Sequence, residues 1–141
     1  MLSNRSMPRS TVIPELGYRD VAAAGEWLCR AFGFTRRLRI GAHRLQLNAG
    51  DGALVLTAMD PSGAIGASHS VMIRVEDVDA HHHRAVIEGA TIVRPPQDHP
   101  YGERQYTAAD PAGRRWTFSQ SIADVDPASW GGELVTLDTD S

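Results

Sequence analysis

The stretch YRDVAAAGEWLCRAFGF, residues 18–34, contains the first half of a pattern that decides the fold. Asp20 is a typical N-cap residue, and Gly33 is typical of the position just after a helix. Between them the apolar residues recur every three or four positions, which indicates one buried helix face. The stretch therefore predicts a helix over Val21–Phe32, preceded by the strand TVIPELGY (11–18).

The second half of the pattern is VEDVDAHHHRAVIEGA, residues 75–90, in which Asp77 takes the place of Asp20. It predicts a helix over Val78–Glu88 after a strand at 69–76. In each half, three alternating segments follow the helix. They are 34–40, 43–50 and 53–59 in the first half, and 91–96, 104–109 and 114–120 in the second. Such a repeat predicts an α+β fold of two βαβββ modules with mixed sheets.

The module boundaries follow from this repeat. The first module with its linker spans 12–67, and the second spans 68–122. Residues 1–11 are polar without periodicity, which predicts a flexible N-terminal tail. Residues 123–141 form a predicted C-terminal tail, in which Asp126 and Pro127 begin a short docked segment.

Composition excludes several classes of function. The chain has 141 residues and a net charge of −3, which does not suggest a nucleic-acid partner. All fourteen basic residues are arginines, so Schiff-base and phosphate-loop lysine chemistry is excluded. A single cysteine excludes an internal disulfide. The sequence has neither an apolar signal core nor a membrane-length apolar run, so we expect a cytoplasmic protein without a membrane partner.

Four segments together resemble the vicinal oxygen chelate superfamily, which includes glyoxalase I, bleomycin-resistance proteins and extradiol dioxygenases. They are 18–34, 75–90, YGERQYTAADPAGRRWTFSQ (101–120) and DVDPASWGG (124–132). The sequence is most similar to the bacterial glyoxalase-like or bleomycin-resistance-like branch. The resemblance implies curved sheets around a cleft. It also implies a homodimer in which modules of both chains line each cleft.

The resemblance also locates the metal ligands of the superfamily's enzymes, which are His, Glu or Gln. The corresponding positions here are Ile13, Val55, Ser70 and Thr117, and none is a good ligand. We therefore expect neither a metal nor another cofactor. His69 is one position away, so it points to the other face unless a bulge shifts the strand. With Glu15 it supplies at most two ligands.

The turn DPAG (110–113) predicts which residues face the cleft. Pairing across it is expected to place Tyr106 opposite Thr117 and Arg104 opposite Ser119. Trp116 and Phe118 then face the helices as core. The predicted cleft residues are Ile13, Glu15, Val55, Ser70, Met72, Arg74, Arg104, Tyr106, Arg115 and Thr117. The run His81–His83 indicates a solvated helix face, because three consecutive helical side chains cannot converge on one ion.

Two functions fit these features. The first is a metal-free protein that binds or sequesters a small aromatic, antibiotic-like molecule, as in antibiotic resistance, with apolar walls and a few orienting polar groups. The alternative is a divergent glyoxalase-like lyase or isomerase. Such an enzyme is either metal-dependent or uses Glu15, Tyr106 or His99 as acid or base. The sequence does not separate a metal-free enzyme from a binder, and it does not identify the ligand.

Overall fold

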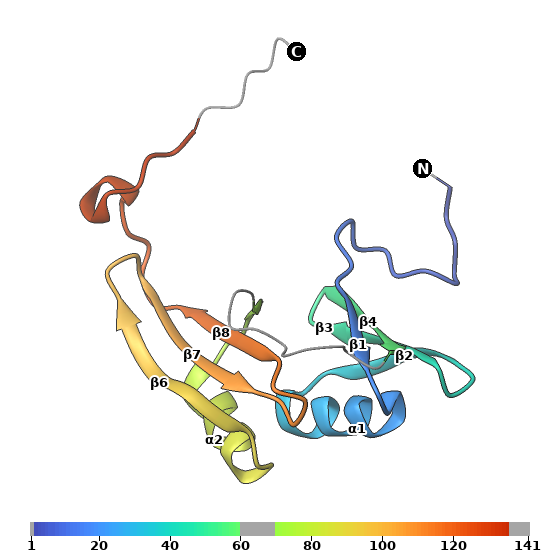
Figure 1. Ribbon diagram of the computed structural model, residues 1–141. Helices are drawn as coiled ribbons and strands as arrows, with labels where there is room; N and C mark the ends of the chain where they lie inside the picture. The colour runs from blue at the N-terminus through green and yellow to red at the C-terminus, as the bar shows by residue number, and fades with distance from the viewer. Residues whose placement is uncertain (1, 60–69, 136–141) are drawn as a thin grey trace.

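The chain folds into two βαβββ modules that lie next to each other (Figure 1). The structure, a computed structural model, describes residues 2–59 and 70–135. The first module consists of β1 (Glu15–Tyr18), α1 (Val21–Phe32), β2 (Thr35–Ile40), β3 (Arg44–Ala49) and β4 (Gly52–Ala58). The second consists of β5 (Val71–Arg74), α2 (Val78–Ile87), β6 (Thr91–His99), β7 (Glu103–Ala109) and β8 (Arg115–Ser121), followed by the 3-10 helix η1 (Pro127–Trp130).

Both modules have the same strand order. The first sheet runs β1-β4-β3-β2 and the second runs β5-β8-β7-β6. In each, the first and last strands of the module pair in parallel and the other pairs are antiparallel. The predicted fold of two mixed-sheet modules is confirmed.

The two helices begin as the sequence predicts. The Asp20 side chain accepts a hydrogen bond from the backbone N–H of Ala23, and Asp77 accepts one from Ala80. Each cap satisfies a backbone donor that the first helical turn leaves free. Gly33 ends α1 with a φ of 78°, a left-handed conformation that glycine adopts without strain.

One hydrophobic core serves both modules. Trp116 and Phe118 are fully buried, as predicted, and they pack with Phe32 at the end of α1. The helices also bond to each other. The Arg84 side chain donates to two backbone carbonyls in the last turn of α1, and the Trp27 indole donates to the Glu88 carbonyl at the end of α2. The modules are therefore joined by packing and by hydrogen bonds.

The segment after β8 turns back toward the β6–β7 connection. Gly102 in that connection has a φ of 81°, and a Cβ there would lie 2.4 Å from the Ala123 carbonyl oxygen. Only glycine permits this close approach. Trp130 of η1 packs on the Tyr101 ring with centroids 5.4 Å apart. Within the described residues, no helix has the length and apolar character needed to cross a membrane.

Candidate functional site

The second sheet presents a polar surface on the side away from α2. Residues directly opposite each other on neighbouring strands share a face of a sheet. Thr117 of β8 lies opposite Met72 of β5 and Thr107 of β7, and Ser119 lies opposite Arg74 and Gln105. We call this surface the second-sheet face. It comprises Ser70, Met72, Arg74, Glu103, Gln105, Thr107, Arg115, Thr117, Ser119 and Ser121.

The predicted register of the last hairpin is wrong by one residue. Tyr106 lies opposite Phe118, not Thr117, and Arg104 lies opposite Gln120. The reason is the turn. The Asp110 N–H donates to the Arg114 carbonyl, so the loop between the paired residues contains three residues, not two. Such loops place glycine in the left-handed region at their end, as Gly113 does with a φ of 86°.

This shift turns Tyr106 and Arg104 toward α2. Tyr106 is only 1% exposed, its hydroxyl lies within hydrogen-bond distance of His81 Nδ1, and burial raises its pKa. Arg104 pairs with Asp79 of α2 at 3.1 Å and with Asp98 at 3.0 Å. Neither side chain belongs to the second-sheet face. The assignment of Tyr106 as an acid or base in the cleft is therefore corrected.

The histidine run also differs from the prediction. His83 is exposed as expected, but His81, on the same helix, packs its ring against those of Tyr106 and Phe118. Its Nε2 lies 3.0 Å from the Phe32 carbonyl, an acceptor, so Nε2 carries the proton and Nδ1 accepts from the Tyr106 hydroxyl. His81 therefore joins the second module to the end of α1 as a neutral ring.

We expect acidification to weaken the fold through His81. Burial lowers the pKa of His81 in the folded protein, so between the folded and unfolded pKa values the unfolded chain binds more protons. The stabilisation by neutral His81 is complete above the unfolded pKa of about 6.5 and is lost as the pH falls from there through the lower pKa of the folded protein. The midpoint of thermal unfolding, measured between pH 7.5 and 5, should fall less in His81→Gln than in the wild type. His83→Gln is the control, and an identical fall in His81→Gln would contradict this role.

The second-sheet face is linked by hydrogen bonds between its side chains. Arg74 donates to the Ser121 hydroxyl at 2.7 Å, and the Ser119 hydroxyl donates to Glu103 at 2.7 Å. Gln105 donates to Ser119 at 3.0 Å. Burial by itself raises the pKa of Glu103, but the bonds from Ser121 and Ser119 and the charge of Arg74 lower it on balance. The face thus presents an ionised carboxylate and a guanidinium close to each other.

Sequence reasoning missed Glu103, Gln105 and Thr107 because of the register error. The placement of Met72, Arg74, Arg115 and Thr117 on one face agrees with the expected alternation. Met72 is 61% exposed and supplies an apolar patch beside the polar side chains. His99 lies at the end of β6 opposite Glu103, where its ring stacks on Tyr101 with centroids 5.1 Å apart. His99 therefore belongs to the end of a strand.

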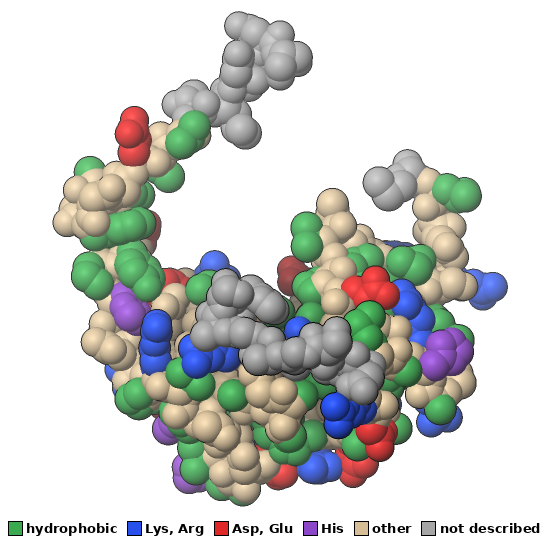
Figure 2. Space-filling view, in the orientation of Figure 1, with side chains coloured by type: hydrophobic (Ala, Val, Ile, Leu, Met, Phe, Trp, Pro, Cys, Tyr) green, Lys and Arg blue, Asp and Glu red, His purple; other side chains and the backbone are tan. Residues whose placement is uncertain are grey.

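The first sheet has an equivalent surface on the side away from α1, which we call the first-sheet face. Val55 lies opposite both Glu15 and Gln46. Val55 is buried, Ile13 just before β1 is half-buried, and Glu15 pairs with Arg44 at 3.0 Å. Gln46, which no sequence pattern indicated, is 2% exposed. In Figure 2 the described parts of the two terminal segments extend from the same side of the molecule.

The residues at the positions that the resemblance assigns to metal ligands do not fit a divalent cation. Ile13 and Val55 have no donor atom, and the hydroxyls of Ser70 and Thr117 lie 3.4 Å apart and face each other. His69 lies outside the described residues. Within 2–59 and 70–135 no three His, Cys, Asp or Glu side chains gather in a way that could hold a metal ion. Carboxylate or imidazole ligands, which such a site requires, are missing from the positions themselves.

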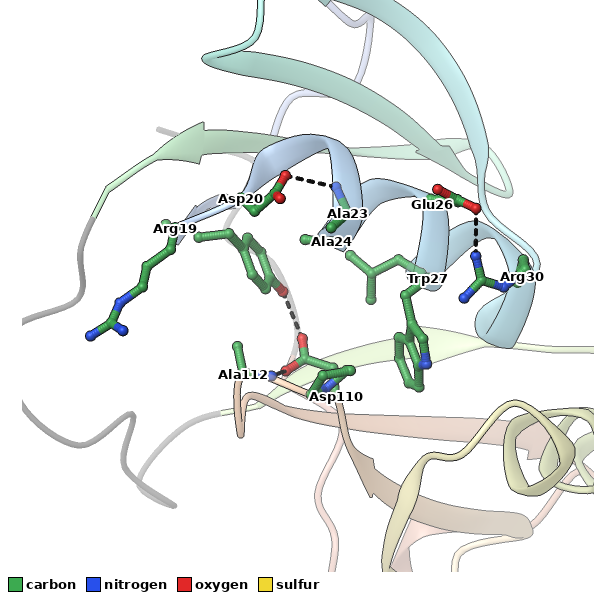
Figure 3. Close-up of a pocket in the computed structure, with 13 residues that line it drawn as sticks. Arg19, Asp20, Ala23, Ala24, Glu26, Trp27, Arg30, Asp110 and Ala112 are labelled. Atoms are coloured by element: carbon green, nitrogen blue, oxygen red, sulfur yellow. Dashed lines mark hydrogen bonds and ion pairs between the residues drawn. The ribbon is translucent and has the colours of Figure 1, made fainter.

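A groove of about 850 Å³ lies on the helix side, between α1 and the turn at 110–112. Figure 3 shows Ala24 and Trp27 of α1 on one side and Asp110 and Ala112 of the turn on the other. Its polar groups serve the fold. Asp20 caps α1, Arg30 pairs with Glu26, and Asp110 accepts from Tyr18 and Trp116. None of the predicted site residues lines this groove, and the two sheet faces remain the candidate site.

The chain is similar to proteins of one superfamily. A sequence model of the Glyoxalase/Bleomycin resistance protein/Dioxygenase superfamily matches residues 12–118. TioX from Micromonospora sp. ML1, of known crystal structure, is 34% identical with a TM-score of 0.67, over 83% of this chain and 100% of that chain. TnmS3 from Streptomyces sp. CB03234, described as an antibiotic binding protein, is 27% identical with a TM-score of 0.65, over 82% and 98%.

A curated relative from Mycobacterium bovis, an uncharacterized protein, is 35% identical over 69 residues. That match covers 49% of this chain and 45% of the relative. The chain therefore spans about half the length of the curated relatives it matches.

Proposed function

The chain belongs to the Glyoxalase/Bleomycin resistance protein/Dioxygenase superfamily, and from that premise we propose that it binds or sequesters a small, aromatic, antibiotic-like molecule without a metal. The observation that carries the proposal is the donor set at the four metal positions, which contains two aliphatic side chains and two hydroxyls. The likeness to TnmS3, described as an antibiotic binding protein, supports the ligand class.

The second-sheet face supports the proposal by its chemistry. Met72 offers apolar contact, while Arg74 and Glu103 offer a charged donor and a charged acceptor. Charge-assisted hydrogen bonds contribute about 1.5–3 kcal/mol each, which is enough to orient a ligand held mainly by apolar contact. We also propose, from the family resemblance, that two chains pair and that modules of both line each site.

The test is calorimetric titration of glycopeptide and polyketide ligands into the wild type, with the molar mass of the same samples measured by light scattering. Arg74→Met and Glu103→Gln should each weaken binding about tenfold, the loss of one charge-assisted bond. Arg39→Met is the matched control, because exposed Arg39 lies opposite Leu45, a core residue, and not on the first-sheet face.

Zinc, nickel and manganese titrations form the second arm of the test, and we expect no stoichiometric site. Stoichiometric metal binding that is lost in Glu15→Gln would instead favour the metal-dependent enzyme. Ligand binding of equal strength in Arg74→Met, Glu103→Gln and the control would contradict the placement of the site on the second-sheet face.

A further inference from the structure

A hydrogen-bonded turn of the N-terminal segment lies against the first-sheet face. The segment belongs to the predicted tail, 1–11, and Figure 1 shows it on the side of the first sheet away from α1. Asn4 holds the turn from within. Its side chain accepts from the Ser6 N–H at 3.0 Å, and its carbonyl accepts from the Met7 N–H at 3.2 Å. These two hydrogen bonds close the backbone turn at residues 4–7.

Two side chains of the sheet donate hydrogen bonds to three consecutive backbone carbonyls of this turn. Arg37 donates through Nη2 to the carbonyls of Arg5, at 3.1 Å, and Met7, at 2.9 Å. Gln46 donates through Nε2 to the carbonyl of Ser6 at 2.8 Å. Arg37 also donates through Nη1 to the Gln46 side-chain oxygen, which fixes the orientation of that amide.

The local fold explains why these two donors meet. A β-bulge between Arg36 and Leu38 interrupts the register of β2, and at this point Arg37 reaches the face of the central strand β3. Gln46 is 2% exposed and shares its face with Val55 and Glu15. A buried amide and a guanidinium are costly to leave without acceptors. This part of the first-sheet face therefore presents hydrogen-bond donors arranged to fit carbonyl or similar oxygens.

The turn does not fill the space around Arg37. One hollow of about 410 Å³ is lined by residues 2–5, 7–9 and Arg37, and another of about 220 Å³ by residues 8–10, Arg37 and the β3–β4 turn. Arg37 borders both hollows. A small molecule could therefore reach the donors beside the turn or in its place.

We infer that Arg37 and Gln46 form a carbonyl-recognising subsite, which the turn of residues 4–7 occupies in the free chain. A ligand with two or more amide, ketone or quinone carbonyls displaces the turn and accepts the same hydrogen bonds. The inference rests on the proposed function for the existence of such a ligand. The apparent affinity for such a ligand is then its intrinsic affinity multiplied by the fraction of molecules in which the turn is open.

Tryptic cleavage after Arg5 tests whether the two donors hold the turn. Trypsin cuts this chain only at arginines, because the chain has no lysine. The Arg5 carbonyl, at the bond that is cut, accepts a hydrogen bond from Arg37. The release of fragment 1–5 from the full chain should be about tenfold faster in Arg37→Met and in Gln46→Leu, because the open state becomes more populated. Arg39→Met removes the same charge from the same strand and should cleave at the wild-type rate. Equal rates in all four proteins would overturn the inference.

A peptide supplied in trans tests carbonyl recognition. The probe is acetyl-Asn-Arg-Ser-Met-Pro-amide, residues 4–8, added to ¹⁵N-labelled full-length Asn4→Ala, in which the chain's own turn is weakened. It should shift the Gln46 side-chain amide resonance at a concentration about tenfold lower than in the wild type. A peptide with alkene isosteres in place of the amides of Arg5, Ser6 and Met7 should not. Equal responses to both peptides, or no response in Asn4→Ala, would overturn the inference.

These measurements separate failure of the subsite from failure of the proposed function. Neither uses an antibiotic, so a chain that binds no such ligand can still show the protected Arg5 bond and the response to the peptide. Conversely, a ligand that binds with the same affinity to Arg37→Met and to wild type, and leaves the cleavage rate at Arg5 unchanged, removes the carbonyl subsite but leaves the proposed function standing.

Discussion

Replacing Asp110 with asparagine is expected to lower the free energy of unfolding by about 3–5 kcal/mol, the cost of breaking a buried charged network. Asp110 is 4% exposed, and its two oxygens accept four hydrogen bonds. One oxygen accepts from the backbone N–H groups of Ala112 and Arg114, and the other from the Tyr18 hydroxyl and the Trp116 indole. An asparagine amide has only one acceptor atom, so two of the donors would face an NH₂ group.

A buried guanidinium lies against the same tyrosine. The Arg114 guanidinium, 8% exposed, lies 5.2 Å from the centre of the Tyr18 ring and donates to the Gly17 carbonyl at 3.1 Å. Its Nε has no hydrogen-bond partner among the described residues, so the Gly17 carbonyl and the Tyr18 ring are the contacts that the structure gives this guanidinium. Burial and the Asp110 carboxylate raise the pKa of Tyr18, which therefore remains a neutral donor in this network.

Urea denaturation of Asp110→Asn and the wild type measures the loss directly. Asp51→Asn is the matched control, because Asp51 occupies the corresponding turn of the first module and is exposed. Its effect should stay within about 0.5 kcal/mol. A loss below 1 kcal/mol in Asp110→Asn would mean that the network is not a main link between the modules.

Phe32→Ala is expected to cost about 3–5 kcal/mol, the usual range for removing a buried aromatic ring. Phe32 is 3% exposed at the last position of α1. Its ring contacts five other rings, with centroids 4.8–6.0 Å away, namely those of Trp27, Phe34, His81, Trp116 and Phe118. Three of these belong to the second module, so the cavity would open between the two modules.

Calorimetry of Phe32→Ala should show the melting temperature lowered by roughly 10 °C, at about 2–4 °C per kcal/mol for a chain of this size. A single transition is expected in both proteins, because the modules share one core. Ile87→Ala is the control, since Ile87 lies on α2 and is 67% exposed. Two separate transitions in the wild type would show that the modules unfold independently.

Under the proposed function both residues also matter for ligand binding, because they hold the two sheet faces relative to each other. Asp110 and Tyr18 connect the last hairpin of the second module to β1, and Phe32 connects α1 to β8. A ligand that contacts both faces requires this arrangement to be fixed in advance. Variants that loosen it should weaken binding even though neither residue lies on either face.

Most of the fold could be predicted from the sequence because its signals are local. Asp20 and Asp77 cap the helices, the apolar spacing identifies their buried sides, and the alternation of the last strand assigns Trp116 and Phe118 to the core. The repetition of these signals in two halves predicts the two modules. The site was less predictable, because it depends on which residues of neighbouring strands lie opposite each other. Arg74 and Thr117 were placed correctly from strand parity, whereas Arg104 and Tyr106 were not.

The sequence by itself determined the element order, the module topology and the core. Tertiary structure alone decided the composition of the faces. A turn with one more residue exchanged Tyr106 and Arg104 for Thr107 and Gln105, because side chains alternate and a shift of one residue moves each to the opposite side. The tertiary structure also brought Arg37 and Gln46 to the carbonyls of the N-terminal turn. The sequence does not show this, because a β-bulge and contacts between residues some thirty to forty positions apart leave no periodic pattern in the chain.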